Sequence, residues 1–154
     1  MSQVEALIEE SIDVDATPER VWSLVTDLPR MARWSPQVVR TVVRGGGPVR
    51  LGTRAVNVNR KGVLVWPTRS KVVRFEPHRD FAFRIKDNFT VWSFTLEATD
   101  AGTRVVQRRE APDGTSPISD TLVRRVLGGQ ESFQTELRGG MRRTLRGIKA
   151  DAEA

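Results

Sequence analysis

Residues 18–36 read PERVWSLVTDLPRMARWSP, a segment that holds three prolines and two of the four tryptophans of the chain. Thr17 is a natural N-cap and Pro18 suits a first helical turn, so a helix is predicted to begin here. Pro29 lacks a backbone donor and restricts the preceding residue, which ends that helix. A second short helix is predicted over about residues 29–34, and the two helices are expected to form a V.

Alternating apolar and polar residues on both sides of this segment predict β-strands. Residues 7–15, LIEESIDVD, alternate as a half-buried strand does, with Glu10 the one polar residue on the apolar side, as expected of an edge position that reaches water. After Pro36 the alternation continues for some 75 residues and is broken at short intervals by turn sequences, which is typical of an antiparallel meander. The predicted strands are 38–44, 53–59, 63–77, 81–85, 89–99 and 103–111.

The last third of the chain is predicted to be helical. Residues 119–127 form a short amphipathic piece, which Gly128 and Gly129 interrupt. A longer helix follows from Gln130, because its apolar residues step by three or four. These residues are Phe133, Leu137, Met141, Leu145 and Ile148. The order of elements is one strand, two short helices, six strands and a long closing helix.

Length and composition favour a single domain over residues 1–154. The apolar fraction of 38% and the charged fraction of 29% are typical of a soluble globular chain, and there is no cysteine for a disulfide or a thiolate metal site. The acidic start, MSQVEALIEESIDVD, lacks the pattern of a signal peptide, and no run of about 18 apolar residues predicts a membrane span. We expect a cytoplasmic protein, a monomer or weak homodimer.

The net charge of +6 comes largely from arginines spread along the whole chain. A spread of this kind is typical of a solvated basic surface, and no stacking aromatics alternate with a basic stripe, so a nucleic-acid partner is not expected. His78 is the only histidine and lies in a predicted turn. The chain therefore offers no His–Cys or carboxylate cluster with metal-ligand spacing, and we expect no metal and no cofactor.

Three segments together carry a resemblance to a known family. They are IDVDATPERVWSLVTDLPRMARWSP, GTRVVQRRE and GGMRRTLRGIKADAEA. The chain resembles the START-like, or polyketide cyclase/dehydrase (SRPBCC), superfamily over nearly its whole length. The resemblance implies an α+β helix-grip fold, in which a curved seven-stranded antiparallel sheet grips a long C-terminal helix, with two short helices after the first strand.

A sheet of seven strands around one helix leaves space between them, and the opening segment would serve as the lid of that space. Trp22 is predicted to pack in the core, and Trp34 to lie at the mouth of the cavity. Gly140 borders the apolar stripe of the long helix, where a missing side chain either admits a sheet tryptophan closely or leaves room for a ligand.

Polar residues on the strands are candidates for orienting a ligand. In the last strand Gln107 and Arg109 share one face, while Arg108 and Glu110 share the other. Either face could point inward, and arginines at strand ends could instead keep their heads in water. The predicted residues at the cavity or its mouth are Trp34, Trp66, Arg69, Trp92, Gln107, Arg109, Phe133, Leu137, Gly140 and Met141.

Three functions are compatible with these features. The resemblance favours a binder of an apolar small molecule, lipid or polyketide-like, which needs only a cavity, a lid and one or two polar anchors. The alternative is a cyclase or dehydratase acting on such a ligand, which needs an acid/base group. Glu110, Glu10 and the arginines are its candidates, and no catalytic residue is assigned. Nucleic-acid binding is the third and weakest.

Overall fold

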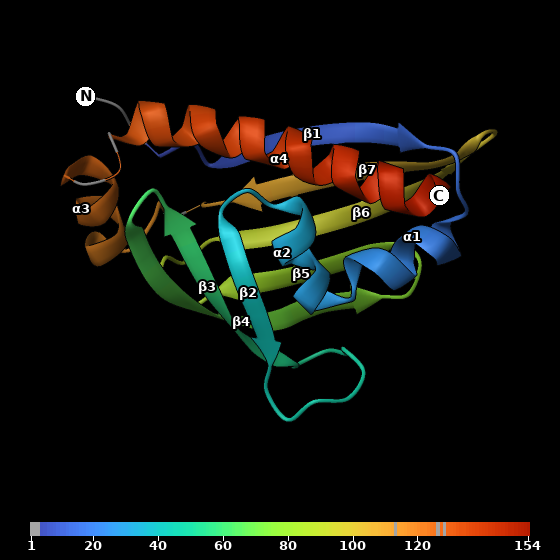
Figure 1. Ribbon diagram of the computed structural model, residues 1–154, viewed down its shortest axis with the longest axis horizontal. Helices are drawn as coiled ribbons and strands as arrows, with labels where there is room; N and C mark the ends of the chain where they lie inside the picture. The colour runs from blue at the N-terminus through green and yellow to red at the C-terminus, as the bar shows by residue number, and fades with distance from the viewer. Residues whose placement is uncertain (1–3, 113, 126, 128) are drawn as a thin grey trace.

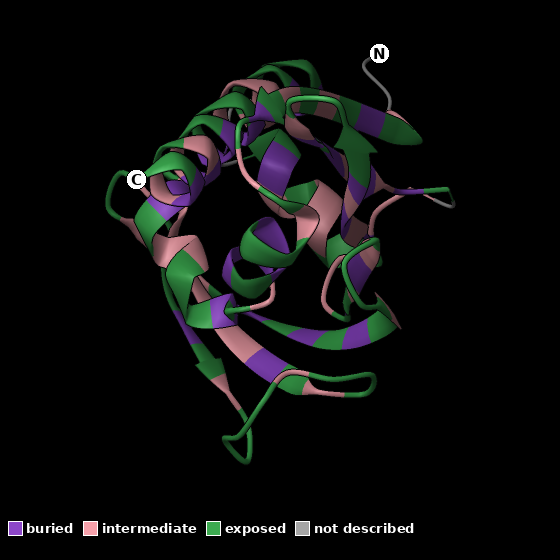
Figure 2. Ribbon diagram, turned by 90° about the vertical axis from the view of Figure 1, so that its right-hand side faces the viewer, coloured by how far each residue is buried: buried purple, intermediate pink, exposed green. Residues whose placement is uncertain are grey.

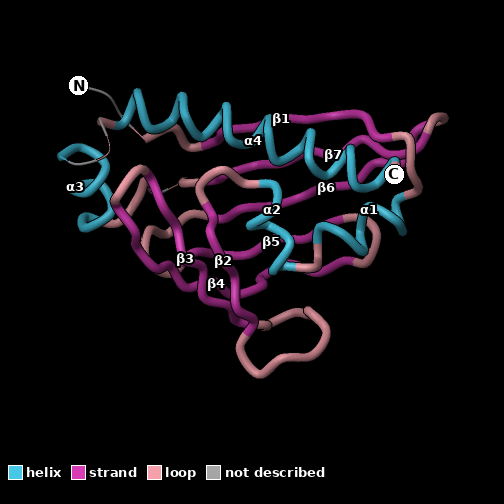
Figure 3. Tube along the Cα trace, in the orientation of Figure 1, coloured by secondary structure: helices cyan, strands magenta, loops and turns pink. Residues whose placement is uncertain are grey.

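The computed structural model describes residues 4–112, 114–125, 127 and 129–154. Its elements run from the N-terminal strand to a long C-terminal helix, as Figures 1 and 3 show. In chain order they are β1 (Leu7–Val14), α1 (Pro18–Val25), the 3-10 turn η1 (Leu28–Arg30), α2 (Met31–Trp34), β2 (Val38–Val43), β3 (Arg54–Lys61), β4 (Leu64–Glu76), β5 (Asp80–Ile85), β6 (Val91–Thr99), β7 (Gly102–Glu110), α3 (Pro117–Arg125) and α4 (Gln130–Glu153).

The seven strands form one antiparallel sheet in the order β1-β7-β6-β5-β4-β3-β2. Register shifts between Val38 and Arg40 and between Val72 and Arg74 insert bulges, which bend strands and increase their twist. The sheet curves around the helices in the view of Figure 2, and α4 runs alongside β1 in Figure 1. The predicted α+β helix-grip architecture is confirmed.

The opening segment folds as two short helical pieces with the predicted start. The Thr17 hydroxyl accepts a hydrogen bond from the Arg20 backbone N–H at 3.2 Å, which caps α1. The first helix ends at Val25, earlier than the proline alone predicts, and beyond it the Thr26 hydroxyl bonds back to the Trp22 carbonyl. The predicted second helix is η1 followed by α2.

The core lies where α1 packs between the sheet and the C-terminal half of α4. Trp22 is buried there, as predicted, with its ring edge-on to Phe75 and Phe81 at centroid distances of 5.2 and 6.1 Å. Leu145 and Ile148 of α4 complete this cluster. Since this packing occupies one end of the space under the sheet, the other end remains for a cavity.

The predicted strand boundaries differ from the observed ones by one or two residues. The clearest difference is at the start of β6, which begins at Val91 and not at Phe89. Phe89 has a φ of 67°, a left-handed backbone conformation that a strand does not contain. His78 has the same φ, in the exposed turn between β4 and β5 where it was predicted.

Candidate functional site

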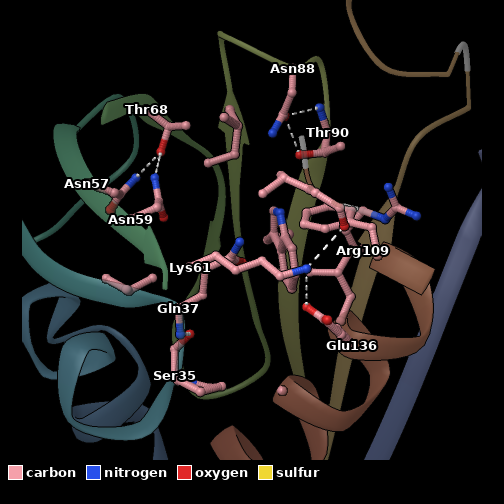
Figure 4. Close-up of a pocket in the computed structure, with 18 of the residues that line it drawn as sticks. Ser35, Gln37, Asn57, Asn59, Lys61, Thr68, Asn88, Thr90, Arg109 and Glu136 are labelled. Atoms are coloured by element: carbon pink, nitrogen blue, oxygen red, sulfur yellow. Dashed lines mark hydrogen bonds and ion pairs between the residues drawn. The ribbon is translucent and has the colours of Figure 1, made fainter. Parts of the chain in front are cut away.

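A cavity of about 790 Å³ lies between the inner face of the sheet and α4. Strands β2 to β7 contribute one wall, and α2 with the residues after it, α3 and α4 contribute most of the rest. Figure 4 shows side chains from these elements pointing toward a common space. A volume of this size is within the range of cavities that hold small organic ligands.

Eight of the ten predicted site residues line this cavity. They are Trp66, Trp92, Gln107, Arg109, Phe133, Leu137, Gly140 and Met141. A Cβ built at Gly140 would meet only the Pro36 ring, at 3.5 Å. No tryptophan therefore packs against this glycine. Of the two alternatives for this glycine, the geometry agrees with open space beside the cavity.

Trp34 lies in the core and not at the mouth of the cavity. Its side chain is buried, with 6% exposed, and its indole Nε1 donates a hydrogen bond to Asp151 Oδ2 at 2.8 Å. The close approach of glycine and tryptophan occurs here, since a Cβ at Gly147 would lie 2.7 Å from Trp34 Cδ1. This bond and, secondarily, Arg33 hold the pKa of Asp151 below its usual range.

Arg69 points away from the cavity. Its guanidinium contacts Asp87 at 3.1 Å, and 58% of its side chain is exposed. Trp66 lies three positions earlier on β4, and an odd separation places two residues on opposite faces of a strand. The same alternation that directs Trp66 inward therefore directs Arg69 outward.

The register of β7 decides which of its faces points inward. Gln107 and Arg109 line the cavity and are each 3% exposed. Glu110 lies on the opposite face, where neighbouring Arg108 bonds Glu9 of β1 at 2.6 Å. Glu10 of the edge strand β1 forms an ion pair with Arg142 of α4. Neither proposed acid, Glu10 or Glu110, is among the described residues that line the cavity.

A row of polar side chains on β3 and β4 was missed by the sequence analysis. Asn59 Nδ2 donates to Thr68 Oγ1 at 3.0 Å, and Asn57 Nδ2 approaches the same oxygen at 3.4 Å. Asn57 Oδ1 in turn accepts from the Thr41 hydroxyl at 2.9 Å. Figure 4 shows this row on one side of the cavity. Asparagines at alternate positions of a predicted strand were the available signal for a polar inner face.

An ion pair joins the two walls at one edge of the cavity. Lys61 Nζ, at the end of β3, lies 3.0 Å from Glu136 Oε2 on α4 and donates to the Leu127 carbonyl at 3.0 Å. The Glu136 side chain is 53% exposed, which places this contact at the opening. Figure 4 shows Lys61 extended across the space toward Glu136. The pair therefore links the β3–β4 hairpin to the helix.

Arg109 is the buried cation of the site. Its Nη2 donates to the Gln134 side-chain oxygen and to the Glu5 carbonyl, each at 3.3 Å. Burial lowers the pKa of Arg109 from its ordinary value, although the nearby Glu5 carboxylate opposes this shift. Glu5 itself forms an ion pair with Arg138. Among the described residues no group of three or more potential metal ligands exists.

Residues 5–153 match the family described as polyketide cyclase / dehydrase and lipid transport. The chain belongs to this family. The family membership predicted from the three sequence segments is thereby confirmed. No curated protein matches the chain significantly. Within the described residues, no helix is long and apolar enough to cross a membrane.

Solved structures of similar fold include polyketide aromatase/cyclases. The di-domain aromatase/cyclase StfQ, from the steffimycin biosynthetic pathway, shares 16% identity at a TM-score of 0.76 over 96% of this chain and 50% of that chain. The Zhui aromatase/cyclase from Streptomyces sp. R1128 shares 17% at a TM-score of 0.73, over 96% and 93%. The polyketide cyclase-like protein Cgl2372 from Corynebacterium glutamicum shares 25% at a TM-score of 0.60, over 94% and 89%.

The chain thus spans about half the length of the di-domain aromatase/cyclases StfQ and BexL, and nearly all of Zhui and Cgl2372. At such low identity to the aromatase/cyclases, these likenesses establish the fold. The family description includes both catalysis and transport, so membership is consistent with a ligand-binding or a cyclase role.

Proposed function

We propose that the protein binds an elongated, largely apolar small molecule, of lipid or polyketide type, in the cavity between the sheet and α4. The observation that carries this proposal is the cavity itself, of about 790 Å³ and lined by both layers of the fold. Packed interiors of ordinary domains contain few voids larger than a water molecule. An accessible space of this size, lined by both layers of the fold, is typical of a site that binds a small molecule.

The lining matches a ligand with an apolar body and several oxygen functions. Trp66 and Trp92 on the sheet and Phe133 and Leu137 on α4 supply apolar surface. The asparagine–threonine row supplies hydrogen-bond donors and acceptors on one side. A few polar groups within an apolar lining fix the orientation of a ligand, while burial of its carbon skeleton provides most of the affinity.

The alternative function is a cyclase or dehydratase acting on such a ligand. That chemistry needs a group that transfers a proton close to the reacting atoms. Among the described lining residues Glu136 is the one carboxylate, and it is half exposed and paired with Lys61. Histidine is absent from the same described lining. These features favour binding over catalysis.

The proposal is tested by purifying the protein natively, extracting it with organic solvent and identifying co-purifying compounds by mass spectrometry. We expect an apolar compound at close to one molecule per chain. The isolated compound is then incubated with fresh protein and followed for conversion. Conversion that is lost in Glu136→Gln would support the cyclase. A protein that carries no compound and binds no hydrophobic probe would contradict the proposal.

A further inference from the structure

Arg109 carries a charge that the described protein does not neutralise. Its side chain is 3% exposed, yet no carboxylate of the described residues lies within ion-pair distance of it. The nearest acid that influences it, Glu5, is paired with a second arginine, Arg138. Two cations therefore share one anion, which leaves one positive charge in excess. Buried charges are ordinarily paired, because leaving them unpaired is costly.

Three buried polar atoms of the cavity lining lack hydrogen-bond partners. They are Arg109 Nε, Gln107 Oε1 and Thr115 Oγ1, and all three belong to residues that line the cavity. Gln107 and Arg109 come from the inner face of β7, whereas Thr115 precedes α3. A buried polar atom without a partner destabilises the folded protein. Unpartnered polar groups on two separate elements around one cavity are typical of a ligand-binding subsite.

We propose that Arg109 and Thr115 anchor the carboxylate, and Gln107 a hydroxyl group, of a monoanionic ligand whose apolar body lies along Trp66 and Trp92. This inference rests on the proposed ligand-binding function and specifies the chemical class of the ligand. One carboxylate supplies the single negative charge that the site lacks. The Arg109 Nε–H and the Thr115 hydroxyl are donors for the carboxylate, whereas Gln107 Oε1 is an acceptor for a ligand hydroxyl.

The remaining basic residues of the lining do not explain this arrangement. Lys61 is neutralised by Glu136, while Arg60 and Arg143 are exposed and keep their charges in water. Arg109 is the buried member of the set, so its interaction with an anion is the least screened. A neutral alcohol or ketone would satisfy its hydrogen bonds but would leave its charge uncompensated.

The test compares two fluorescent probes of matched shape, anthracene-9-carboxylate and anthracene-9-methanol. Energy transfer from the tryptophans to the anthracene ring reports binding. We expect the wild-type protein to prefer the carboxylate by about tenfold or more, the difference that one charge-assisted hydrogen bond confers. Arg109→Gln should remove this preference by weakening carboxylate binding, with little effect on the alcohol. Arg109→Lys, which keeps the charge, should retain part of it.

Arg108→Gln is the matched control, because this adjacent guanidinium lies on the outer face with Glu9. It should retain the full preference. In the ligand-free state Arg109→Gln should melt at or above the wild-type temperature, since an unpaired buried charge is removed. A purely structural Arg109 would instead give a lower melting temperature and equal loss of both probes.

The outcomes separate the two proposals. Equal affinity of the wild-type protein for both probes, or an undiminished preference in Arg109→Gln, would overturn the carboxylate subsite and leave ligand binding intact. Binding of neither probe to wild-type protein would overturn the carboxylate subsite, and together with the absence of a co-purifying compound it would overturn the ligand-binding proposal as well.

Discussion

Gly147 on α4 lies directly under the ring of Trp34. A Cβ at this position would approach Trp34 Cδ1 to 2.7 Å and Cγ to 3.1 Å. The indole is held in place by its hydrogen bond to Asp151, so it has little freedom to withdraw. We expect Gly147→Ala to destabilise the protein by about 1–3 kcal/mol, the usual cost of forcing an extra carbon into a packed site. Urea unfolding measures the change.

Gly139 on the same helix provides the control. A Cβ at Gly139 would have no neighbour within 4 Å, so alanine there introduces no clash. Gly139→Ala should stabilise the protein by up to about 1 kcal/mol through helix propensity alone. Equal effects of the two substitutions would show that the Trp34 contact does not restrict Gly147.

Asp151 is predicted to make stability depend on acid pH. Its folded-state pKa is lowered, chiefly by the Trp34 hydrogen bond, so its carboxylate stabilises the fold above its ordinary pKa of about 3.9. This contribution is lost as the pH falls through the lower, folded-state pKa. The melting temperature of wild type should exceed that of Asp151→Asn at neutral pH, and the difference should shrink as the pH falls below about 4.

Asp100→Asn, at an exposed turn, controls for the loss of one negative charge. A gap between wild type and Asp151→Asn that stays constant with pH would contradict the assignment. Sequence alone misplaced Trp34 because both of its partners, Gly147 and Asp151, lie more than 110 positions away in the chain. The local sequence shows that residue 34 has a large apolar side chain, whereas contacts with residues distant in the chain decide where that side chain packs.

At the scale of elements, periodicity predicted most of the fold. Every predicted strand exists, and the alternation of residues correctly placed Gln107 and Arg109 on the same face of β7. Alternation leaves open which face points inward, because that depends on the pairing of β7 with its neighbours. The bounds of β6 were also beyond sequence reasoning, since no residue pattern shows that Phe89 adopts a positive φ.

The ion pair between β3 and α4 is predicted to slow ligand exchange. Lys61 and Glu136 join the hairpin to the helix at a partly exposed edge of the cavity, and we expect ligands to enter past this contact. Lys61→Met should raise both the association and the dissociation rate of the anthracene probe. The dissociation constant should change by less than about fivefold, because partly exposed ion pairs contribute little free energy. Stopped-flow fluorescence measures both rates.

Lys71→Met is the matched control, since Lys71 is an exposed lysine of β4 that does not line the cavity. High salt should accelerate exchange in wild type and have less effect on Lys61→Met, because it screens the pair. Unchanged rates in Lys61→Met would show that ligands enter elsewhere.

At the scale of the whole molecule, α1 and the C-terminal half of α4 pack against one end of the sheet, and the cavity lies under the other end. The family resemblance predicted the cavity, and the apolar stripe of α4 predicted several of its lining residues. The polar row of β3 and β4 was not predicted, although Asn57 and Asn59 alternate visibly in the sequence. Asparagines on the inner face of a strand are unusual in a packed core. Beside a cavity they supply hydrogen-bond donors and acceptors for a ligand.

Gly140 offers a test of whether this space costs stability. A Cβ at this position would meet Pro36 at an ordinary contact distance of 3.5 Å, and the rest of its surroundings border the cavity. Gly140→Leu should therefore fill part of the space and gain helix propensity. We expect a stabilisation of about 1 kcal/mol without ligand and at least tenfold weaker probe binding, the trade-off typical of functional sites.

Gly140→Ala separates the two contributions, because it adds helix propensity with almost no volume. It should gain most of the stability and keep near wild-type probe affinity. Thermal unfolding with and without probe gives both quantities for each variant. Because a ligand stabilises only the state that binds it, the melting temperature of wild type should rise with probe concentration, while that of Gly140→Leu should rise far less. If leucine left binding intact, the ligand would not occupy the part of the cavity beside Gly140.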